Sequence, residues 1–183
     1  MTSRRHSGRA RQFRGLQTAA LLCAAFMLGG CGAMSSMVAG ARSMAGMAPK
    51  PIAPAWKSLI LSAANDANGN SAVAIDLVLA KDAAALESLE TLPAAKWFAM
   101  RTDLQKTFPD TLAVMRFELV PSQTVKLDEK QLDSQRALGA FIFANYASPG
   151  EHRARLLMNT EGYVVQLNEQ SFKLRELKSG VPQ

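Results

Sequence analysis

The chain of 183 residues is poor in the side chains that catalysis and metal binding most often use. It contains two cysteines and two histidines, and its aromatic residues make up 7% of the total. A zinc site usually takes several Cys or His ligands, and a catalytic triad needs a nucleophile, a base and an orienting group. No P-loop, Gly-x-Gly-x-x-Gly or Gly-x-Ser-x-Gly motif occurs in the sequence. These absences indicate that the protein is not an enzyme and needs no metal or other cofactor.

The remaining ionisable candidates are better explained as solvated surface. His152 stands beside two arginines on a predicted surface strand, and we expect its side chain to be solvated. The acidic pairs Asp128 with Glu129 and Glu87 with Glu90 lie in polar, alternating surroundings. A solvated face explains them better than a carboxylate dyad.

The first 30 residues predict an export signal that is removed. A segment with five arginines and no acidic residue precedes an apolar run of about thirteen residues, Leu16 to Leu28. That run is too short for the roughly 20 residues that a membrane-spanning helix needs. It leads into Leu28-Gly29-Gly30-Cys31, which resembles the lipobox of bacterial lipoproteins. The resemblance implies cleavage before Cys31, a diacylglycerol on its thiol and an N-acyl chain on its amine. A plain signal peptide with an incidental cysteine, or an uncleaved anchor, is the alternative.

Removal of the signal changes what the composition implies. The whole chain carries a formal charge of +6, and the signal accounts for five of these charges, so the chain from Cys31 carries +1. A basic surface for nucleic acid therefore loses its support. Cys23 leaves with the signal, so the exported chain can form no internal disulfide even in an oxidising compartment.

Residues 31–54 are predicted to form a flexible, lipid-anchored tether. They are rich in Gly, Ala, Ser and Met, lack periodic apolar spacing, and end among three prolines. Such a composition is typical of a linker. The methionines could instead suggest a soft-metal site. They have no fixed scaffold, so we expect no metal there.

Residues 55–183 are long enough for one domain with its own core, and their patterns predict a mostly β, two-sheet sandwich. Apolar residues recur with period two in several short segments separated by turn residues. Val73 to Leu79 is predicted to be a half-buried strand with Asp76 on its other face. A run that is apolar on both faces predicts a central strand. The other predicted strands cover 56–64, 113–119, 124–127, 137–146 (the central one), 152–158, 163–167 and 171–177.

A helical insertion is predicted over about 83–108, between the second and third strands. Asp82 can cap a helix from Ala83, and apolar residues then recur at helical spacing up to Phe108. Trp97 and Phe98 within it have two interpretations. One or both close the edge of the sandwich as core, or an exposed aromatic serves a partner.

The segment Asn65 to Ser71 predicts an exposed, hairpin-type loop. Its Asn, Asp and Gly residues tolerate turn conformations and positive φ, and they cannot build a core. A polar loop on a rigid sandwich is a common recognition site. We therefore expect alanine at Asp66, Asn68 or Asn70 to leave folding nearly unchanged.

Several features in order resemble one known family. After the lipobox and tether, the loop NDANGNS leads into the alternating strand AVAIDLVLAKD, then into the insertion AAALESLETLPAAKWFAMRTDLQKTF. The segments FELVPSQTVKLD and ALGAFIFANYASP follow. Together they resemble the type VI secretion outer-membrane lipoproteins, TssJ, also called SciN or VasD. The first loop departs from the family pattern because it is shorter and lacks prolines.

The resemblance implies a transthyretin-like sandwich, anchored in the outer membrane and facing the periplasm. Gly32 replaces the aspartate that would resemble an inner-membrane retention signal. The resemblance also implies an adaptor that binds the periplasmic domain of TssM in the secretion membrane complex. The expected partner-binding residues are those of the first loop: Asn65, Asp66, Asn68, Gly69, Asn70 and Ser71. Another interaction lipoprotein, such as a pilotin or toxin inhibitor, and a small-molecule-binding sandwich are the alternatives.

Overall fold

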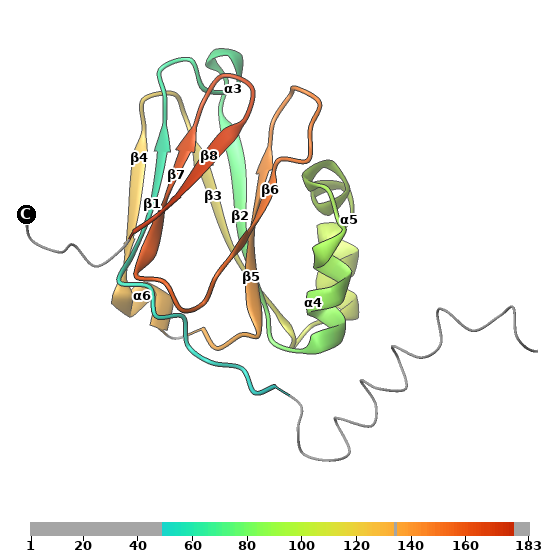
Figure 1. Cartoon of the computed structure of the whole chain (residues 1–183). Coiled ribbons are helices and arrows are strands. Elements are labelled where there is room, and N and C mark those ends of the chain that lie inside the picture. The colour runs from blue at the N-terminus through green and yellow to red at the C-terminus, as the bar shows by residue number, and fades with distance from the viewer. Residues whose placement is uncertain (1–48, 134, 178–183) are drawn as a thin grey trace, which may run out of the picture. The chain divides into compact units, whose positions relative to one another are not determined.

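A computed structural model describes residues 49–133 and 135–177 of the chain (Figure 1). These residues form two four-stranded sheets with strand orders β4-β1-β7-β8 and β3-β2-β5-β6. The predicted signal peptide over 1–30, Cys31 and residues 32–48 of the predicted tether lie outside the described residues. The strands are β1 (Ser58–Ala63), β2 (Val73–Ala80), β3 (Leu112–Leu119), β4 (Thr124–Asp128), β5 (Gly139–Asn145), β6 (Arg153–Leu156), β7 (Gly162–Leu167) and β8 (Phe172–Glu176).

The predicted mostly β, two-sheet sandwich is confirmed. Every strand pair is antiparallel except β1 with β7, which run parallel with Ser58 opposite Gly162. The alternate residues of each sheet that point inward form one apolar core, in which Leu59, Ile75 and Ile142 are fully buried. Inward alternation of this kind is what holds two sheets face to face.

The predicted hairpin-type loop over Asn65 to Ser71 needs correction. The strands that it joins, β1 and β2, lie in different sheets, so the loop crosses from one sheet to the other. The physical reason is long-range pairing. β1 is flanked by β4 and β7, and no position beside it is left for β2.

The helical insertion predicted between the second and third strands is confirmed. It consists of α4 (Ala83–Glu90) and α5 (Ala94–Thr107), which cover the outer face of the sheet that contains β2 and β5 (Figure 1). The carboxylate of Asp82 accepts a hydrogen bond from the N–H of Ala85 at 2.7 Å and so caps α4. Among the described residues, none of the helices has both the length and the apolar content needed to cross a bilayer.

A second, smaller core lies between the insertion and the sheet. Trp97 is fully buried and stacks on Phe143 of β5 with ring centroids 5.1 Å apart. Val78, Leu89 and Phe141 are among the other buried residues of this core. Trp97 is therefore core, as the first interpretation predicted, and it is not available to a partner.

Strand β2 is buried on both faces, which corrects the prediction of a half-buried strand. Asp76 has only 1% of its surface exposed. Its carboxylate accepts hydrogen bonds from Nε1 of Trp97 at 2.8 Å and from the Arg101 guanidinium at 3.0 Å. The face that the alternation marked as polar is covered because the insertion folds back over it.

The predicted tether over 31–54 is too long at its C-terminal end. Ile52 exchanges two backbone hydrogen bonds with Ala137, at 3.0 and 2.9 Å, and Pro54 is buried. Residues 49–54 thus belong to the folded unit that starts at Pro49. A short helix, α6 (Glu129–Asp133), follows β4 and begins with a reciprocal cap between Asp128 and Gln131.

Candidate interaction surface at the loop end

Four loops meet at one end of the sandwich, which we call the loop end: residues 64–72, 120–123, 146–152 and 168–171. Their strands alternate in direction, so every odd-numbered strand ends here (Figure 1). Backbone hydrogen bonds tie the first loop to two of the others. The N–H of Ser122 donates to the carbonyl oxygen of Ala64 at 3.2 Å, and the N–H of Asn68 donates to the carbonyl oxygen of Asn168 at 3.1 Å. The loop end is therefore one connected surface with contributions from both sheets.

The first loop turns through three consecutive residues with positive φ. These are Asn68 at 51°, Gly69 at 61° and Asn70 at 63°. Asn and Gly adopt this left-handed conformation at lower cost than other residues, which explains the composition of the loop. A Cβ on Gly69 would meet nothing within 4 Å, so backbone conformation and not space favours glycine there.

Most of the predicted partner-binding residues are exposed. Asn65, Asp66, Gly69, Asn70 and Ser71 all face solvent. Ala67 beneath them is fully buried and anchors the loop to the core. The loop thus presents polar groups on a fixed backbone, which suits recognition by hydrogen bonds.

Asn68 differs from its neighbours and corrects part of the prediction. Its side-chain Nδ2 donates to the carbonyl oxygen of Ala72 at 2.9 Å, and its Oδ1 accepts from the N–H of Ala147 at 2.8 Å. The side chain therefore holds the first loop to the β5–β6 loop. Asn68 has a structural role, and alanine at this position should not be neutral to folding.

The β5–β6 and β7–β8 loops are also joined to each other. The hydroxyl of Ser148 donates to the carbonyl oxygen of Gln170 at 2.6 Å. From the sequence, residues 147–151 were only the connection between the strands predicted over 137–146 and 152–158. Nothing in the local pattern indicated that these loops would meet the first loop, since the contact depends on which sheet each strand joins.

His152 is not the solvated side chain that we predicted. It is half-buried with φ at 41°, and its ring lies 4.8 Å from the ring of Tyr146. Its Nε2 donates to the carbonyl oxygen of Ser148 at 2.7 Å. This contact closes the β5–β6 loop on itself. Burial raises the pKa of the neighbouring Tyr146 hydroxyl to about 12.

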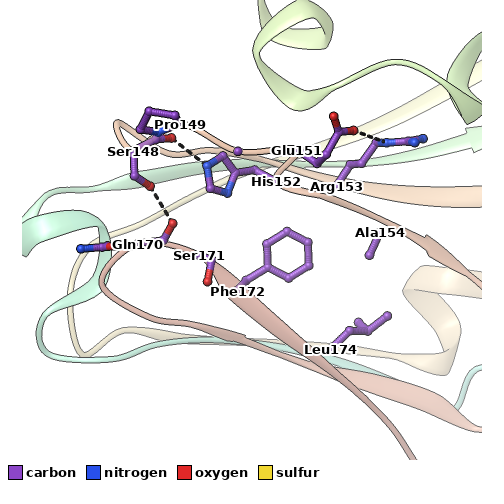
Figure 2. A pocket seen from close by; sticks show the side chains of 11 residues that line it. Ser148, Pro149, Glu151, His152, Arg153, Ala154, Gln170, Ser171, Phe172 and Leu174 are labelled. Atoms are coloured by element: carbon purple, nitrogen blue, oxygen red, sulfur yellow. Dashed lines mark hydrogen bonds and ion pairs between the residues drawn. The ribbon is translucent and has the colours of Figure 1, made fainter.

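The side of the sandwich between β6 and β8 is hollowed. A groove of about 540 Å³ is lined by residues of the β5–β6 and β7–β8 loops and by Ala154, Phe172 and Leu174 (Figure 2). We call it the β6–β8 groove. A second hollow, of about 460 Å³, lies on the other face of β6, against Glu90 and Phe141. Both are open at the surface and differ from the apolar cavity that a small-molecule-binding sandwich would need.

The chemistry available at the loop end is hydrogen bonding and shape. Within residues 49–133 and 135–177, no three or more His, Cys, Asp or Glu side chains are grouped so as to hold a metal ion. His152 is engaged by a carbonyl oxygen and an aromatic ring. Asp128 caps α6, and Glu90 contacts Arg155. The predicted lipidation site, Cys31, lies outside the described residues.

No protein-family model and no curated protein matches the chain. Solved structures are similar to it. Lip from Serratia marcescens, described as a membrane bound component of the type VI secretion system, is 16% identical, with a TM-score of 0.43 over 67% of this chain and 96% of its own. The type VI secretion lipoprotein TssJ1 from Pseudomonas aeruginosa is 15% identical, with a TM-score of 0.46 over 72% and 99%. These solved neighbours belong to type VI secretion.

A further similar structure is described as the type VI secretion protein TssM C-terminal domain from EAEC. It is 15% identical, with a TM-score of 0.47 over 66% of this chain and 97% of that one. Likeness at this level does not decide a function.

Proposed function

We propose that the protein is an outer-membrane-anchored periplasmic lipoprotein. In this proposal it acts as an adaptor in the type VI secretion membrane complex and binds the periplasmic domain of TssM through the loop end. The lipobox resemblance at Cys31 supports the anchor. Two or three acyl chains make membrane attachment stable, whereas a single chain binds only marginally, because each buried methylene adds about 0.8 kcal/mol.

The observation that carries the binding role is the construction of the first loop. It is fixed by Ala67 in the core and by the side chain of Asn68, yet four polar residues and Gly69 remain exposed. A rigid loop loses little conformational entropy on binding, so more of the interaction energy appears as affinity.

Recovery of the partner from membranes tests the proposal. The chain is purified from detergent-solubilised membranes, and TssM is expected to co-purify with it. A triple variant, Asn65→Ala with Asp66→Ala and Ser71→Ala, removes exposed groups and spares the positions with positive φ. Loss of TssM from the triple variant alone is expected. Equal recovery from both proteins would contradict the proposed site.

A matched control lies at the opposite end of the sandwich. Asn159 and Lys130 are exposed and belong to the β6–β7 connection and to α6. The variant Asn159→Ala with Lys130→Ala also removes exposed polar groups but leaves the loop end intact. It should retain TssM, and loss of TssM from it would show that the effect is not specific to the loop end.

A further inference from the structure

Strand β6 lies at the edge of its sheet. Among residues 49–133 and 135–177 it pairs only with β5, and the N–H of Ala144 donates to the carbonyl oxygen of His152 at 2.9 Å. In an antiparallel ladder, alternate residues turn their N–H and C=O groups toward the partner strand. By the register, the backbone N–H and C=O groups of Ala154 and Leu156 face β5, as those of His152 do. Arg153 and Arg155 therefore turn their backbone groups outward.

The two arginine side chains do not shield this edge. Charged side chains on edge strands often prevent pairing with other chains. Here the guanidinium of Arg153 donates to the carbonyl oxygens of Leu89 and Glu90, at the end of α4, and that of Arg155 contacts the Glu90 carboxylate. Both side chains are thus held back against the insertion. In the described part of the chain, the outward backbone groups of Arg153 and Arg155 have no strand beside them.

Hollows lie on both faces of this edge. On the inner face, Ala154 points into the β6–β8 groove, where Phe172 and Leu174 of the other sheet are only partly buried (Figure 2). On the outer face, the second hollow is lined by Glu90, Arg153 and Arg155. Successive side chains of an added strand would point alternately into these two hollows, since side chains alternate across a sheet.

We propose that the β6 edge is a second interaction surface, which binds an extended segment of a partner protein by strand addition. Main-chain hydrogen bonds to Arg153 and Arg155 would supply affinity, and the two hollows would select the side chains. The segment carries apolar residues at the alternate positions that face Phe172 and Leu174. Its other residues are polar because they face the arginines and Glu90. This inference goes beyond the proposed function and does not depend on the identity of TssM.

The probe is a nine-residue peptide of alternating valine and threonine, with a lysine at each end for solubility. Its control has the same composition with the valines grouped together. Hydrogen exchange of the full chain, purified in detergent, is followed by mass spectrometry with residue-level fragmentation. Short strand-adding peptides are expected to bind with a Kd on the order of 1 mM, so peptide at five times that value should slow exchange of the Arg153 and Arg155 amides about sixfold.

The decisive comparison is Arg155→Pro against Arg155→Ala. Both lose the contact with Glu90, but only proline removes the outward N–H, and proline is tolerated on an edge strand where that N–H faces away from the sheet. The slowing at Arg153 should persist in Arg155→Ala and disappear in Arg155→Pro. Equal slowing in both variants would overturn the proposal, as would no slowing in the unmodified chain or equal slowing by the control peptide.

A second variant decides the matter if Arg155→Pro does not fold. Ala154→Asp places a carboxylate in the β6–β8 groove, where an apolar side chain of the added strand should sit, and Ala154→Ser is its control of similar size. Loss of slowing in the aspartate variant alone is expected. Concentration-dependent sedimentation without peptide would show whether a second copy of the chain occupies the edge, and dimer formation lost in Ala154→Asp would overturn the assignment to a partner protein.

Discussion

At the scale of single residues, the loop end depends on a few side chains with more than one contact. Asn68 combines a positive φ with hydrogen bonds to Ala72 and Ala147. The neighbouring residues Asn65 and Asp66 are exposed, and their side chains have no hydrogen bond within the described part of the chain. Asn68 thus holds the loop in place, whereas Asn65 and Asp66 present their polar groups at the surface.

Replacement of Asn68 by alanine should destabilise the domain by about 2 kcal/mol, through two lost hydrogen bonds and a left-handed backbone that alanine resists. Asn68→Gly loses the same hydrogen bonds but accepts the backbone, so it should cost about 1 kcal/mol less. Urea unfolding of both variants measures the difference. Equal free energies of unfolding for Asn68→Ala and the unmodified protein would mean that the cross-loop contact is not formed in solution.

Tyr146 should make the protein sensitive to alkali. Its pKa is raised to about 12 by burial, so the folded state keeps the proton that the unfolded state loses near pH 10. The stability associated with this group is present below pH 10 and is lost between pH 10 and 12, to an extent of about 2 kcal/mol. Tyr146→Phe cannot ionise and should show a smaller fall across that range. Parallel pH profiles for the two proteins would contradict the burial of this hydroxyl.

At the scale of elements, a buried charge fixes the insertion to the sheet. Asp76 on β2 contacts Trp97 and Arg101, which lie one turn apart on α5. The Arg101 side chain keeps 32% of its surface exposed, whereas the carboxylate is fully enclosed. Removal of Arg101 would therefore leave a buried carboxylate, whereas removal of the Asp76 charge would leave an arginine that can reach water.

Removal of the Arg101 guanidinium should lower the free energy of unfolding more than neutralisation of Asp76. Arg101→Met leaves a carboxylate buried without its cation, and loss of one partner of a buried pair typically costs about 3 kcal/mol or more. Asp76→Asn keeps an acceptor for Trp97 and leaves an arginine that can reach water, so about 1–2 kcal/mol is expected. The double variant should be more stable than Arg101→Met alone. Urea unfolding of the cycle measures the coupling, and strict additivity would contradict the pair.

Local sequence patterns predicted where helices and strands lie better than which of their faces are buried. The cap at Asp82 and the apolar recurrence up to Phe108 predicted the insertion, and the doubly apolar run over 137–146 predicted the central strand β5. The prediction that the Asp76 face of β2 would be exposed was wrong. Alternation shows which residues are polar, but it does not show whether another element packs over them. A charged residue that is satisfied by Trp97 and Arg101 has the same sequence signal as one in water.

At the scale of the whole molecule, sheet membership lay beyond local patterns. The parallel pairing of β1 with β7 joins residues about a hundred positions apart, and it forces the first loop to cross between sheets. Polar composition placed the candidate site at Asn65 to Ser71 but could not show that the loops around Ser148 and Gln170 would join it. The groove beside β6 likewise depends on two strand edges that meet only in the folded chain.

The anchor belongs to the same scale. Cys31→Ser should yield an unprocessed or soluble periplasmic protein and abolish secretion, while the domain from Pro49 still folds. Fatty-acid labelling tests acylation directly, and equal labelling of both proteins would refute the lipobox. Sucrose-gradient fractionation should place the unmodified protein in the outer membrane, and its recovery with the inner membrane would contradict the location.

The most direct test of the central claim is the affinity of the full chain for the periplasmic domain of TssM. The triple variant Asn65→Ala, Asp66→Ala and Ser71→Ala is titrated beside the control Asn159→Ala with Lys130→Ala, and both are checked by melting curves. If the exposed row lies within the interface, the triple variant should bind at least about tenfold more weakly, since a loss of about 1.4 kcal/mol or more is expected when interface contacts are removed. The control and both melting curves should be unchanged. Unaltered affinity of a normally folded triple variant would contradict the account.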